Sequence, residues 1–198
     1  MKHVVTYSHK QKYVWYCVPK TGFRSIYEIL KNKTKIDFHQ SFAYKPLPSN
    51  HPLYDDSVWK DYFKFTFVRN PWDRLLSCYV QKFANPKSFY SKKVKVNSFR
   101  EFIISFIQHE DLTTCNIHHR LQTELMNPKK MNFIGRFETL QKDFNKVSSK
   151  IGIGKPQLPK LNPSKHKHYT TYYDDEMNQI VQKKYKQDIE LLGYDFRK

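Results

Sequence analysis

The chain has few cysteines and no long apolar run. Its 198 residues contain three cysteines, Cys17, Cys78 and Cys115, and this odd, scattered set offers no disulfide framework. A reducing compartment fits such a set best. No window approaches the roughly 18 apolar residues of a membrane-spanning helix, and the N-terminal residues lack the continuous apolar stretch of a signal peptide. We therefore expect a soluble, cytoplasmic chain without a transmembrane segment.

The sequence also lacks internal repeats, low-complexity tracts and a Walker A string, in which a glycine and four further residues precede Gly-Lys-Ser/Thr. The missing string argues against an ordinary P-loop NTPase. A length of 198 residues is that of one domain, large enough to bury a sizeable core. We expect a single domain spanning residues 1–198.

Acidic residues are in short supply. There are 35 Lys and Arg residues against 18 Asp and Glu residues, which gives a formal net charge of +17 and a pI near 9.7. Such a balance favours anionic partners, namely a nucleotide, an acidic polysaccharide, a nucleic acid or a membrane surface. Much of the charge is scattered lysine, as in 92–95, which is more typical of a solubilising surface than of a binding site.

The sequence does contain two basic motifs, and each lies where a predicted strand is followed by a predicted helix. The first follows the β-rich stretch 13–18, reads Pro19-Lys20-Thr21-Gly22, and precedes helical spacing over 25–31. In an open α/β sheet this position presents unpaired N–H groups and the positive end of a helix dipole to an anion. Taken alone, the same string could equally be a surface turn.

The second motif follows the predicted strand 64–68. Arg69 comes at the strand end, and Pro71 stands where a helix can begin, because the first turn does not need its N–H. Ser77 falls about two turns into this helix, on a face that can point back toward Arg69. An arginine and a hydroxyl can share one phosphate, whereas the alternative is a surface ion-pair arginine and an ordinary helix serine.

The remaining sequence predicts a chain of alternating strands and helices. Residues 4–18 form a hairpin, 131–134 a strand, and 43–52, with three prolines, an irregular loop over the active-site face. A Gly-, Pro- and Lys-rich stretch at 152–168 predicts a basic loop. Helices are expected over 71–83, 98–109, 115–126, 137–149 and 174–191.

The ordered motifs resemble those of sulfotransferases that use 3′-phosphoadenosine 5′-phosphosulfate (PAPS), in particular the carbohydrate-type, family 2-like sulfotransferases. The resemblance continues almost to the C-terminus, through 134–140, Tyr169, Tyr172 and 193–196. It implies an α/β fold of the P-loop NTPase-like type, with a central parallel sheet flanked by helices. It also implies transfer of a sulfuryl group from PAPS to a hydroxyl, most readily that of a carbohydrate. A trimmed domain from the secretory pathway is the alternative to a cytoplasmic protein.

The resemblance assigns roles to both motifs. In that family the arginine and serine matching Arg69 and Ser77 hold the 3′-phosphate of the donor, and the first loop holds the 5′-phosphosulfate. The chain departs from many relatives at Phe23-Arg24-Ser25, where they carry Gly-Thr-Ser or Ser-Thr-Ser, so Arg24 replaces a hydroxyl that would face the 5′-phosphate. The expected donor-binding residues are Pro19, Lys20, Thr21, Gly22, Phe23, Arg24, Ser25, Arg69 and Ser77.

Sulfuryl transfer needs a cation near the leaving oxygen and a base near the acceptor. Lys20 suits the first role. His39 is a candidate base because histidine titrates near neutrality, with a structural histidine as the alternative. His119, in a stretch resembling the family's His-x-x-Gln, is a second candidate, and helical spacing would place it and Gln122 on one face. Asp61 and Glu138 are weaker candidates.

We expect no metal and no nucleic-acid partner. Cys115 near His118 and His119 is at most half of a metal site, because a second pair of ligands is not evident. Two alternative functions remain open. One is a P-loop-like kinase, which would need a Walker lysine and metal ligands. The other is a non-catalytic protein that binds nucleic acid or another polyanion.

Overall fold

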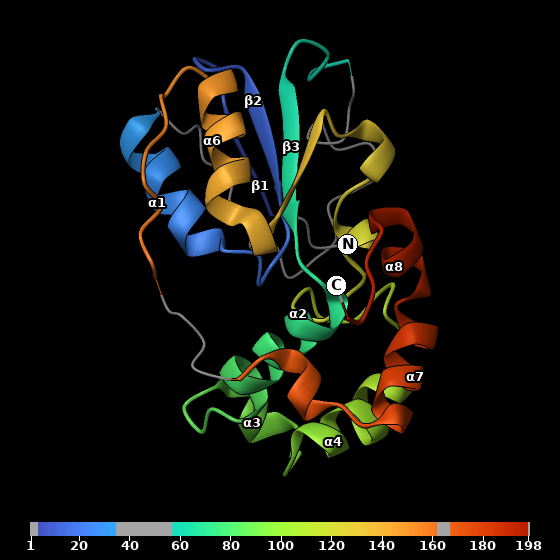
Figure 1. The fold of residues 1–198 in the computed structure, drawn as a ribbon. Coiled ribbons are helices and arrows are strands. Elements are labelled where there is room, and N and C mark those ends of the chain that lie inside the picture. Colours follow the sequence, from blue (N-terminus) through green and yellow to red (C-terminus); the bar gives the residue numbers. More distant parts are fainter. Residues whose placement is uncertain (1–3, 35–56, 162–166, 198) are drawn as a thin grey trace. The chain divides into compact units, whose positions relative to one another are not determined.

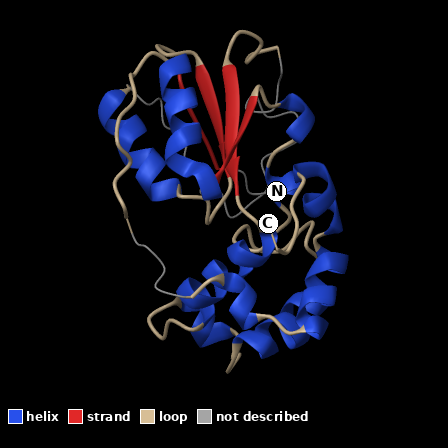
Figure 2. Cartoon of the chain, in the orientation of Figure 1, coloured by secondary structure: helices blue, strands red, loops and turns tan. Residues whose placement is uncertain are grey.

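The computed structural model describes residues 4–34, 57–161 and 167–197, and it divides the chain into two compact units. One consists of Met1–Val68 and Glu124–Leu161, and the other of Arg69–Thr123 and Asn162–Lys198. We call them the sheet unit and the helical unit (Figures 1 and 2). The expectation of a single domain stays a prediction.

The sheet unit contains a four-stranded sheet in the order β1-β2-β3-β4. β2 pairs in parallel with β3, and β3 with β4, whereas β1 pairs with β2 in antiparallel register, Thr6 opposite Trp15. The expected parallel sheet is therefore corrected to a mixed sheet, and the predicted hairpin is confirmed. The reason is the short link at 9–12, because a parallel pair needs a long crossover. The strands are β1 (Val4–Ser8), β2 (Tyr13–Cys17), β3 (Phe63–Val68) and β4 (Phe133–Arg136).

Two helices, α1 (Phe23–Lys33) and α6 (Leu140–Lys150), cover the same face of this sheet (Figure 1). Alternate strand residues point toward them, and the shared core includes Trp15, Phe65, Ile26 and Phe144. Burying such aromatic and aliphatic side chains contributes about 1.5–3 kcal/mol each. The packing fixes the strand ends from which the predicted binding loops continue.

The helical unit is built around aromatic side chains. Phe83 packs against Phe102 with ring centroids 4.6 Å apart and against Phe106, within a core that also holds Trp72 and Tyr185. The longer elements are α2 (Pro71–Cys78), η2 (Tyr79–Phe83), α3 (Phe89–Lys93), η3 (Phe102–Phe106), α7 (Asp175–Lys184) and α8 (Lys186–Leu192). The shorter ones are α4 (Phe99–Glu101), η4 (Ile107–His109) and η7 (Tyr169–Tyr172). Of three further short elements, α5 (Gln122–Leu125) crosses the boundary between the two units, whereas η5 (Pro128–Lys130) and η6 (Phe137–Thr139) belong to the sheet unit.

Most predicted helices are present. The predicted helix 71–83 is formed by α2 and the π-helical turn η2, and 98–109 by α4, η3 and η4. The predicted helix 137–149 corresponds to η6 and α6. The predicted helix 174–191 is two helices, because the backbone of Tyr185 leaves the helical conformation between α7 and α8.

The predicted helix 115–126 is wrong, since only Gln122–Leu125 is helical. In the segment before this short helix, side chains accept hydrogen bonds from backbone N–H groups. The Asp111 carboxylate accepts from the Thr113 N–H at 3.0 Å, and the Asn116 side chain accepts from the His118 N–H at 3.1 Å. Such local bonds compete with the helical ladder. His119 therefore precedes the helix and does not share a helical face with Gln122.

Two expected loops have different outcomes. The stretch 43–52 lies outside the described residues. Of the predicted basic loop 152–168, the described part forms neither helix nor strand through Leu161. Among the described residues, none of the helices has the length and apolar character needed to cross a membrane.

Candidate functional site

The first predicted loop leaves the carboxyl end of β2 and leads into α1. Thr21 is buried, and its hydroxyl donates to the Val18 carbonyl at 2.7 Å. Lys20 and Gly22 have φ values of 76° and 81°, in the left-handed region. The turn therefore directs the chain sharply into the first turn of α1, where no side chain caps the N–H groups. These N–H groups and the helix dipole form an arrangement suited to an anion.

Gly22 is required at its position. A Cβ there would lie 2.6 Å from Cδ2 of Leu140 in α6, and its φ of 81° is unfavourable for other residues. The loop conformation thus depends both on glycine and on the packing of α6.

The three residues after Gly22 differ in what they can offer a ligand. The ring of Phe23 stacks against Trp15 and Tyr27, with centroids 5.3 and 5.7 Å away, so its side chain belongs to the core. Arg24 is exposed, whereas Ser25 is buried. A role for Phe23 in anion binding would therefore rest on its backbone.

Arg69 follows the last residue of β3 in the chain and is 5% exposed. Its Nε donates to Asp73 Oδ2 at 2.8 Å, one helical turn further on. Ser77 lies another turn along α2 and is also buried. The spacing places Asp73 and Ser77 on one face of α2, and Arg69, which precedes the helix, is joined to that face through Asp73. The sequence predicts that Ser77 lies on a face that can point back toward Arg69.

The backbone of Arg69 is held by the side chain of Gln122. The Arg69 N–H donates to Gln122 Oε1 at 3.0 Å, and Gln122 Nε2 donates to the Arg69 carbonyl at 2.9 Å. This amide pairs with Arg69 as a neighbouring strand would. Sequence reasoning noted Gln122 only through a resemblance and missed this role, because the partners are 53 positions apart.

Asp188 in α8 holds Gln122 in turn. Its carboxylate accepts from the Gln122 N–H at 2.8 Å, from the Thr123 N–H at 3.0 Å and from the Thr123 hydroxyl at 2.8 Å. Asp188 is fully buried, and burial raises its pKa despite these bonds. A chain of buried polar contacts therefore runs from Asp188 through Gln122 to Arg69.

The start of α2 is fixed by Asn70 and Pro71. The Asn70 side chain accepts from the Trp72 N–H at 3.1 Å, and its Nδ2 donates to the Tyr169 hydroxyl at 3.1 Å and to the Asp195 carbonyl at 3.0 Å. Pro71 occupies the first turn, as predicted. The C-terminal segment thus supports the helix that carries Ser77.

Arg74 is buried in the helical unit and is 1% exposed, so it is not a surface residue. Its Nη1 donates to the Arg120 carbonyl at 2.7 Å and its Nη2 to the Ile117 carbonyl at 2.9 Å. Burial lowers its pKa, yet an arginine stays charged in proteins. Through these two hydrogen bonds, Arg74 connects the backbone of residues 117–120 to α2.

The two histidine candidates have different outcomes. His39 lies outside the described residues. His119 is 2% exposed, and its Nε2 lies 3.3 Å from Glu110 Oε2. Burial lowers its pKa, but hydrogen bonds with Cys115, Cys78 and Glu110 outweigh burial and raise the pKa to about 11.

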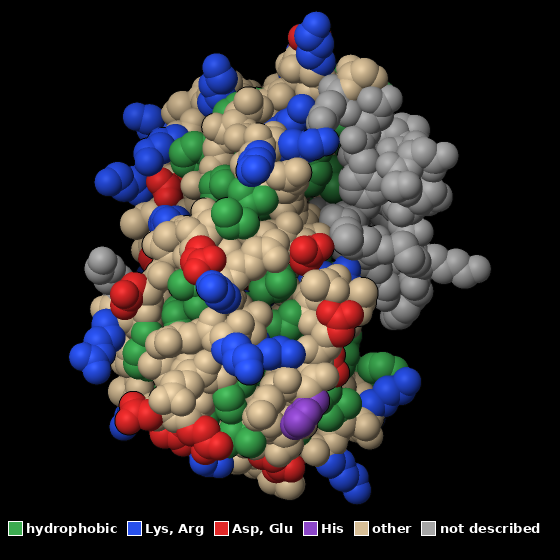
Figure 3. Space-filling view, turned by 90° about the vertical axis from the view of Figure 1, so that its right-hand side faces the viewer, with side chains coloured by type: hydrophobic (Ala, Val, Ile, Leu, Met, Phe, Trp, Pro, Cys, Tyr) green, Lys and Arg blue, Asp and Glu red, His purple; other side chains and the backbone are tan. Residues whose placement is uncertain are grey.

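The formal charge does not gather into one surface on the face shown in Figure 3. There, Lys and Arg side chains are scattered among acidic and polar ones. This pattern agrees with the expectation that much of the lysine is a solubilising surface.

Comparison with known proteins decides the family. The profile of the sulfotransferase family matches residues 2–195. The chain belongs to the sulfotransferase family. Its Pro19-Lys20-Thr21-Gly22 loop and its Arg69–Ser77 motif both lie within the matched residues, and so do Gln122 and Asp188.

Relatives of this sulfotransferase-family chain include two named sulfotransferases. Carbohydrate sulfotransferase 9 of Homo sapiens is 30% identical over 161 residues, covering 68% of this chain and 35% of the relative. Carbohydrate sulfotransferase 14 of Danio rerio is 27% identical over 167 residues, covering 68% of this chain and 44% of the relative. The chain thus spans less than half the length of these two proteins.

A third relative is an uncharacterized protein of Archaeoglobus fulgidus. It is 31% identical over 116 residues, covering 57% of this chain and 86% of that protein. No solved structure matches the sulfotransferase-family chain described here.

Proposed function

We propose that the chain is a sulfotransferase that moves a sulfuryl group from PAPS to a hydroxyl of a carbohydrate. Family membership supports the reaction class, and the names of the relatives support the acceptor class. The observation that carries the proposal is the loop after β2, with left-handed Lys20 and Gly22 and an uncapped helix N-terminus. We expect it to hold the 5′-phosphosulfate.

The second part of the donor, the 3′-phosphate, is assigned to Arg69 and Ser77. Support comes from the position of Ser77 on the face of α2 that carries Asp73, from the burial of both residues, and from the ion pair and amide contacts that orient Arg69. A guanidinium held in one orientation loses little conformational entropy when it binds a phosphate. The proposal therefore assigns the two ends of one nucleotide to two separate motifs.

The bound donor supplies the sulfuryl group and a phosphate leaving group. Lys20 is proposed to stabilise the charge that grows on the bridging oxygen as the S–O bond breaks. A base takes the proton of the acceptor hydroxyl as its oxygen attacks sulfur. His39 is the proposed base. His119 fits this role less well, because the residue is 2% exposed and its Nε2 already lies 3.3 Å from Glu110 Oε2.

Calorimetry with two nucleotides tests the donor site. Adenosine 3′,5′-bisphosphate should bind clearly more tightly than AMP, which lacks the 3′-phosphate, and Arg69→Ala should weaken its binding by about 1.5–3 kcal/mol. Lys10→Ala, a change at an exposed lysine, serves as the control. Equal affinities for the two nucleotides, or equal affinities of the two variants, would contradict the assignment.

Turnover separates chemistry from binding. Lys20→Ala should lower transfer of labelled sulfate far more than it lowers affinity for adenosine 3′,5′-bisphosphate, because Lys20 is proposed to act on charge that develops in the transition state. His39→Ala should lower turnover by about 10²–10⁴-fold while donor affinity stays nearly unchanged. Near-normal turnover by His39→Ala would show that another residue is the base.

A panel of acidic and neutral glycans would identify the acceptor. Magnesium-dependent ATP turnover, or steeply salt-dependent polynucleotide binding with indifference to the nucleotide, would refute the proposal.

A further inference from the structure

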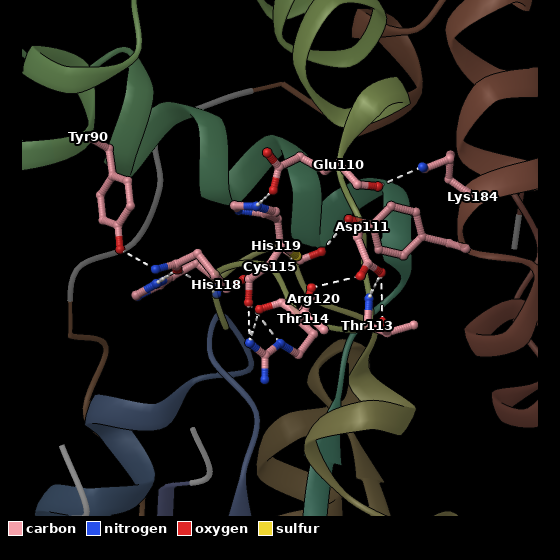
Figure 4. A network of polar contacts seen from close by, with 12 residues as sticks. Tyr90, Glu110, Asp111, Thr113, Thr114, Cys115, His118, His119, Arg120 and Lys184 are labelled. Carbon is pink, nitrogen blue, oxygen red and sulfur yellow. Dashed lines mark hydrogen bonds and ion pairs between the residues drawn. The ribbon is translucent and has the colours of Figure 1, made fainter. Parts of the chain in front are cut away.

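A cluster of metal-type ligands lies in the helical unit, among residues for which the proposed transfer reaction provides no role. Glu110, Cys115 and His119 each present a ligand atom, and these atoms all lie within 4.8 Å of one another. Glu110 follows the turn η4, whereas Cys115 and His119 lie in the irregular segment that replaces the predicted helix. Figure 4 shows the Glu110 and His119 side chains pointing toward one another beside Cys115.

The chemistry of the set favours zinc. Thiolate, imidazole and carboxylate are the three ligand types that bind Zn²⁺, at about 2.0–2.3 Å in a tetrahedral arrangement, so that neighbouring ligand atoms lie about 3.3–3.8 Å apart. The nitrogen–oxygen separation between His119 and Glu110 is already 3.3 Å. The remaining separations of at most 4.8 Å need to close by no more than about 1–1.5 Å.

A fourth donor is available from α2, although its sulfur is not among the ligand atoms that all lie within 4.8 Å of one another. Cys78 is fully buried, and its thiol, like that of Cys115, is close enough to hydrogen-bond the His119 ring. Two of the three cysteines in the chain therefore lie beside one imidazole. Two sulfurs, one nitrogen and one carboxylate form a complete set for a closed structural site.

The backbone that carries these ligands is held on several sides. The Arg120 guanidinium donates to the carbonyls of Thr114 and Cys115, and Lys184 Nζ donates to the Glu110 carbonyl at 2.7 Å (Figure 4). The Tyr185 hydroxyl donates to the His119 carbonyl. Such outer contacts orient metal ligands. Arg120 and Lys184 also balance charge, because two thiolates and a carboxylate exceed the charge of Zn²⁺ by one.

A buried ion pair between His119 and Glu110 is the simpler interpretation of two of these residues. It does not explain why two thiols, one from α2 and one from the 110–120 segment, lie beside the same imidazole. We propose that Cys78, Cys115, His119 and Glu110 form a structural zinc site that ties the 110–120 segment to α2. This inference does not depend on the proposed transfer reaction.

Metal binding by the full chain tests the site. After treatment with a chelator, the protein should bind one equivalent of Zn²⁺, and Co²⁺ in its place should show thiolate-to-cobalt charge-transfer absorption. Cys115→Ser and Cys78→Ser should each weaken Zn²⁺ binding by more than 10-fold. Cys17→Ser removes a buried thiol of the sheet unit and should leave binding unchanged.

A second measurement covers the case in which a ligand variant fails to fold. In the unaltered protein, Zn²⁺ should protect Cys115 from alkylation, as followed by mass spectrometry, and chelation should restore its reactivity. Less than a tenth of an equivalent of bound Zn²⁺, an equal loss of binding in Cys17→Ser, or alkylation of Cys115 that Zn²⁺ does not alter would each overturn the proposal in favour of a buried ion pair alone.

Discussion

The two units position their predicted phosphate-binding motifs by different physical means. In the sheet unit the loop is set by backbone conformation, with left-handed φ values at Lys20 and Gly22 and the close approach of Leu140. In the helical unit Arg69 is set by buried polar side chains, with Gln122 and Asp188 in series. The first motif is therefore sensitive to the size of one residue. The second is sensitive to hydrogen-bonding groups far away in the sequence.

The two units also differ in how they hold a buried aspartate, as the pKa shifts of Asp143 and Asp188 show. Asp143 in α6 accepts from Lys146 Nζ at 2.9 Å, from the Thr139 hydroxyl at 2.7 Å and from the Arg136 N–H at 3.0 Å. Burial raises the pKa of Asp143, but these bonds outweigh burial and lower it overall. For Asp188 the effect of burial is larger than that of its hydrogen bonds, so its pKa is raised. The less deeply buried carboxylate of Asp143 thus stabilises the fold when ionised, whereas the fully buried carboxylate of Asp188 costs free energy to ionise.

The largest expected effect is at Arg74. Arg74→Met should lower the free energy of unfolding by about 3 kcal/mol, because it leaves the buried carbonyls of Ile117 and Arg120 without donors. Urea denaturation measures the change. Arg100→Ala removes an arginine of the same unit that is 56% exposed and paired with Asp174. It should cost under about 1 kcal/mol, and equal losses in the two variants would contradict the structural role of Arg74.

The next effect tests the conformational motif of the sheet unit. Gly22→Ala should destabilise the protein by about 2–3 kcal/mol, since it combines an unfavourable φ with a clash against Leu140, and it should abolish nucleotide binding. Gly152→Ala is the matched control, because its φ is +76° but nothing lies within 4 Å of the added Cβ. The control should lose only about 1 kcal/mol and should bind nucleotide normally. Similar losses in both variants would show that the approach of Leu140 has no effect.

The polar chain of the helical unit is tested at Gln122. Gln122→Ala should weaken binding of adenosine 3′,5′-bisphosphate by about 10-fold, because the amide that holds the Arg69 backbone is removed. Binding of AMP should change much less, since AMP has no 3′-phosphate. A matched glutamine is Gln141, whose side chain accepts from the Leu158 N–H at 2.8 Å in the sheet unit. Gln141→Ala should not alter the preference between the two nucleotides, and an unchanged preference in Gln122→Ala would separate Gln122 from phosphate binding.

The smallest effect concerns the two aspartates and pH. Asp143 has a lowered folded-state pKa, so it contributes stability above its ordinary pKa of about 3.9 and loses that contribution as pH falls through the lowered value. Asp143→Asn should therefore be less stable than the unaltered protein by about 1 kcal/mol at pH 7, and the gap should close below about pH 4.

Asp188 should show the opposite slope. Its folded-state pKa is raised, so the native protein binds more protons than the unfolded chain between the ordinary and the raised pKa values, and stability falls as pH rises through that window. The stability of Asp188→Asn relative to the unaltered protein should therefore increase with pH over the same range. Urea denaturation of both variants from pH 3 to 7 measures the slopes, and slopes of the same sign would contradict the contrast between the two sites.

Local patterns in the sequence predicted much of the fold. The hairpin, the strands around 64–68 and 131–134 and the helices that begin at Pro71 and near Phe137 are confirmed. Their signals lie within a few neighbouring residues, as apolar periodicity, a turn or a proline. The predicted helix over 115–126 was wrong because the side chains of Asp111, Asn116 and Arg74 form hydrogen bonds with backbone groups of this region. These bonds compete with the backbone hydrogen bonds of a helix.

The sequence by itself determined the strand–loop–helix placement of both basic motifs and membership of a family whose motifs appear in order, because these depend on residues adjacent in the chain. Only the tertiary structure decided that Gln122 and Asp188 hold Arg69, that Arg74 is buried, and that Glu110, Cys115 and His119 converge. These contacts join residues brought together by packing. Hydrogen bonds between residues so far apart leave no periodic trace in a single sequence.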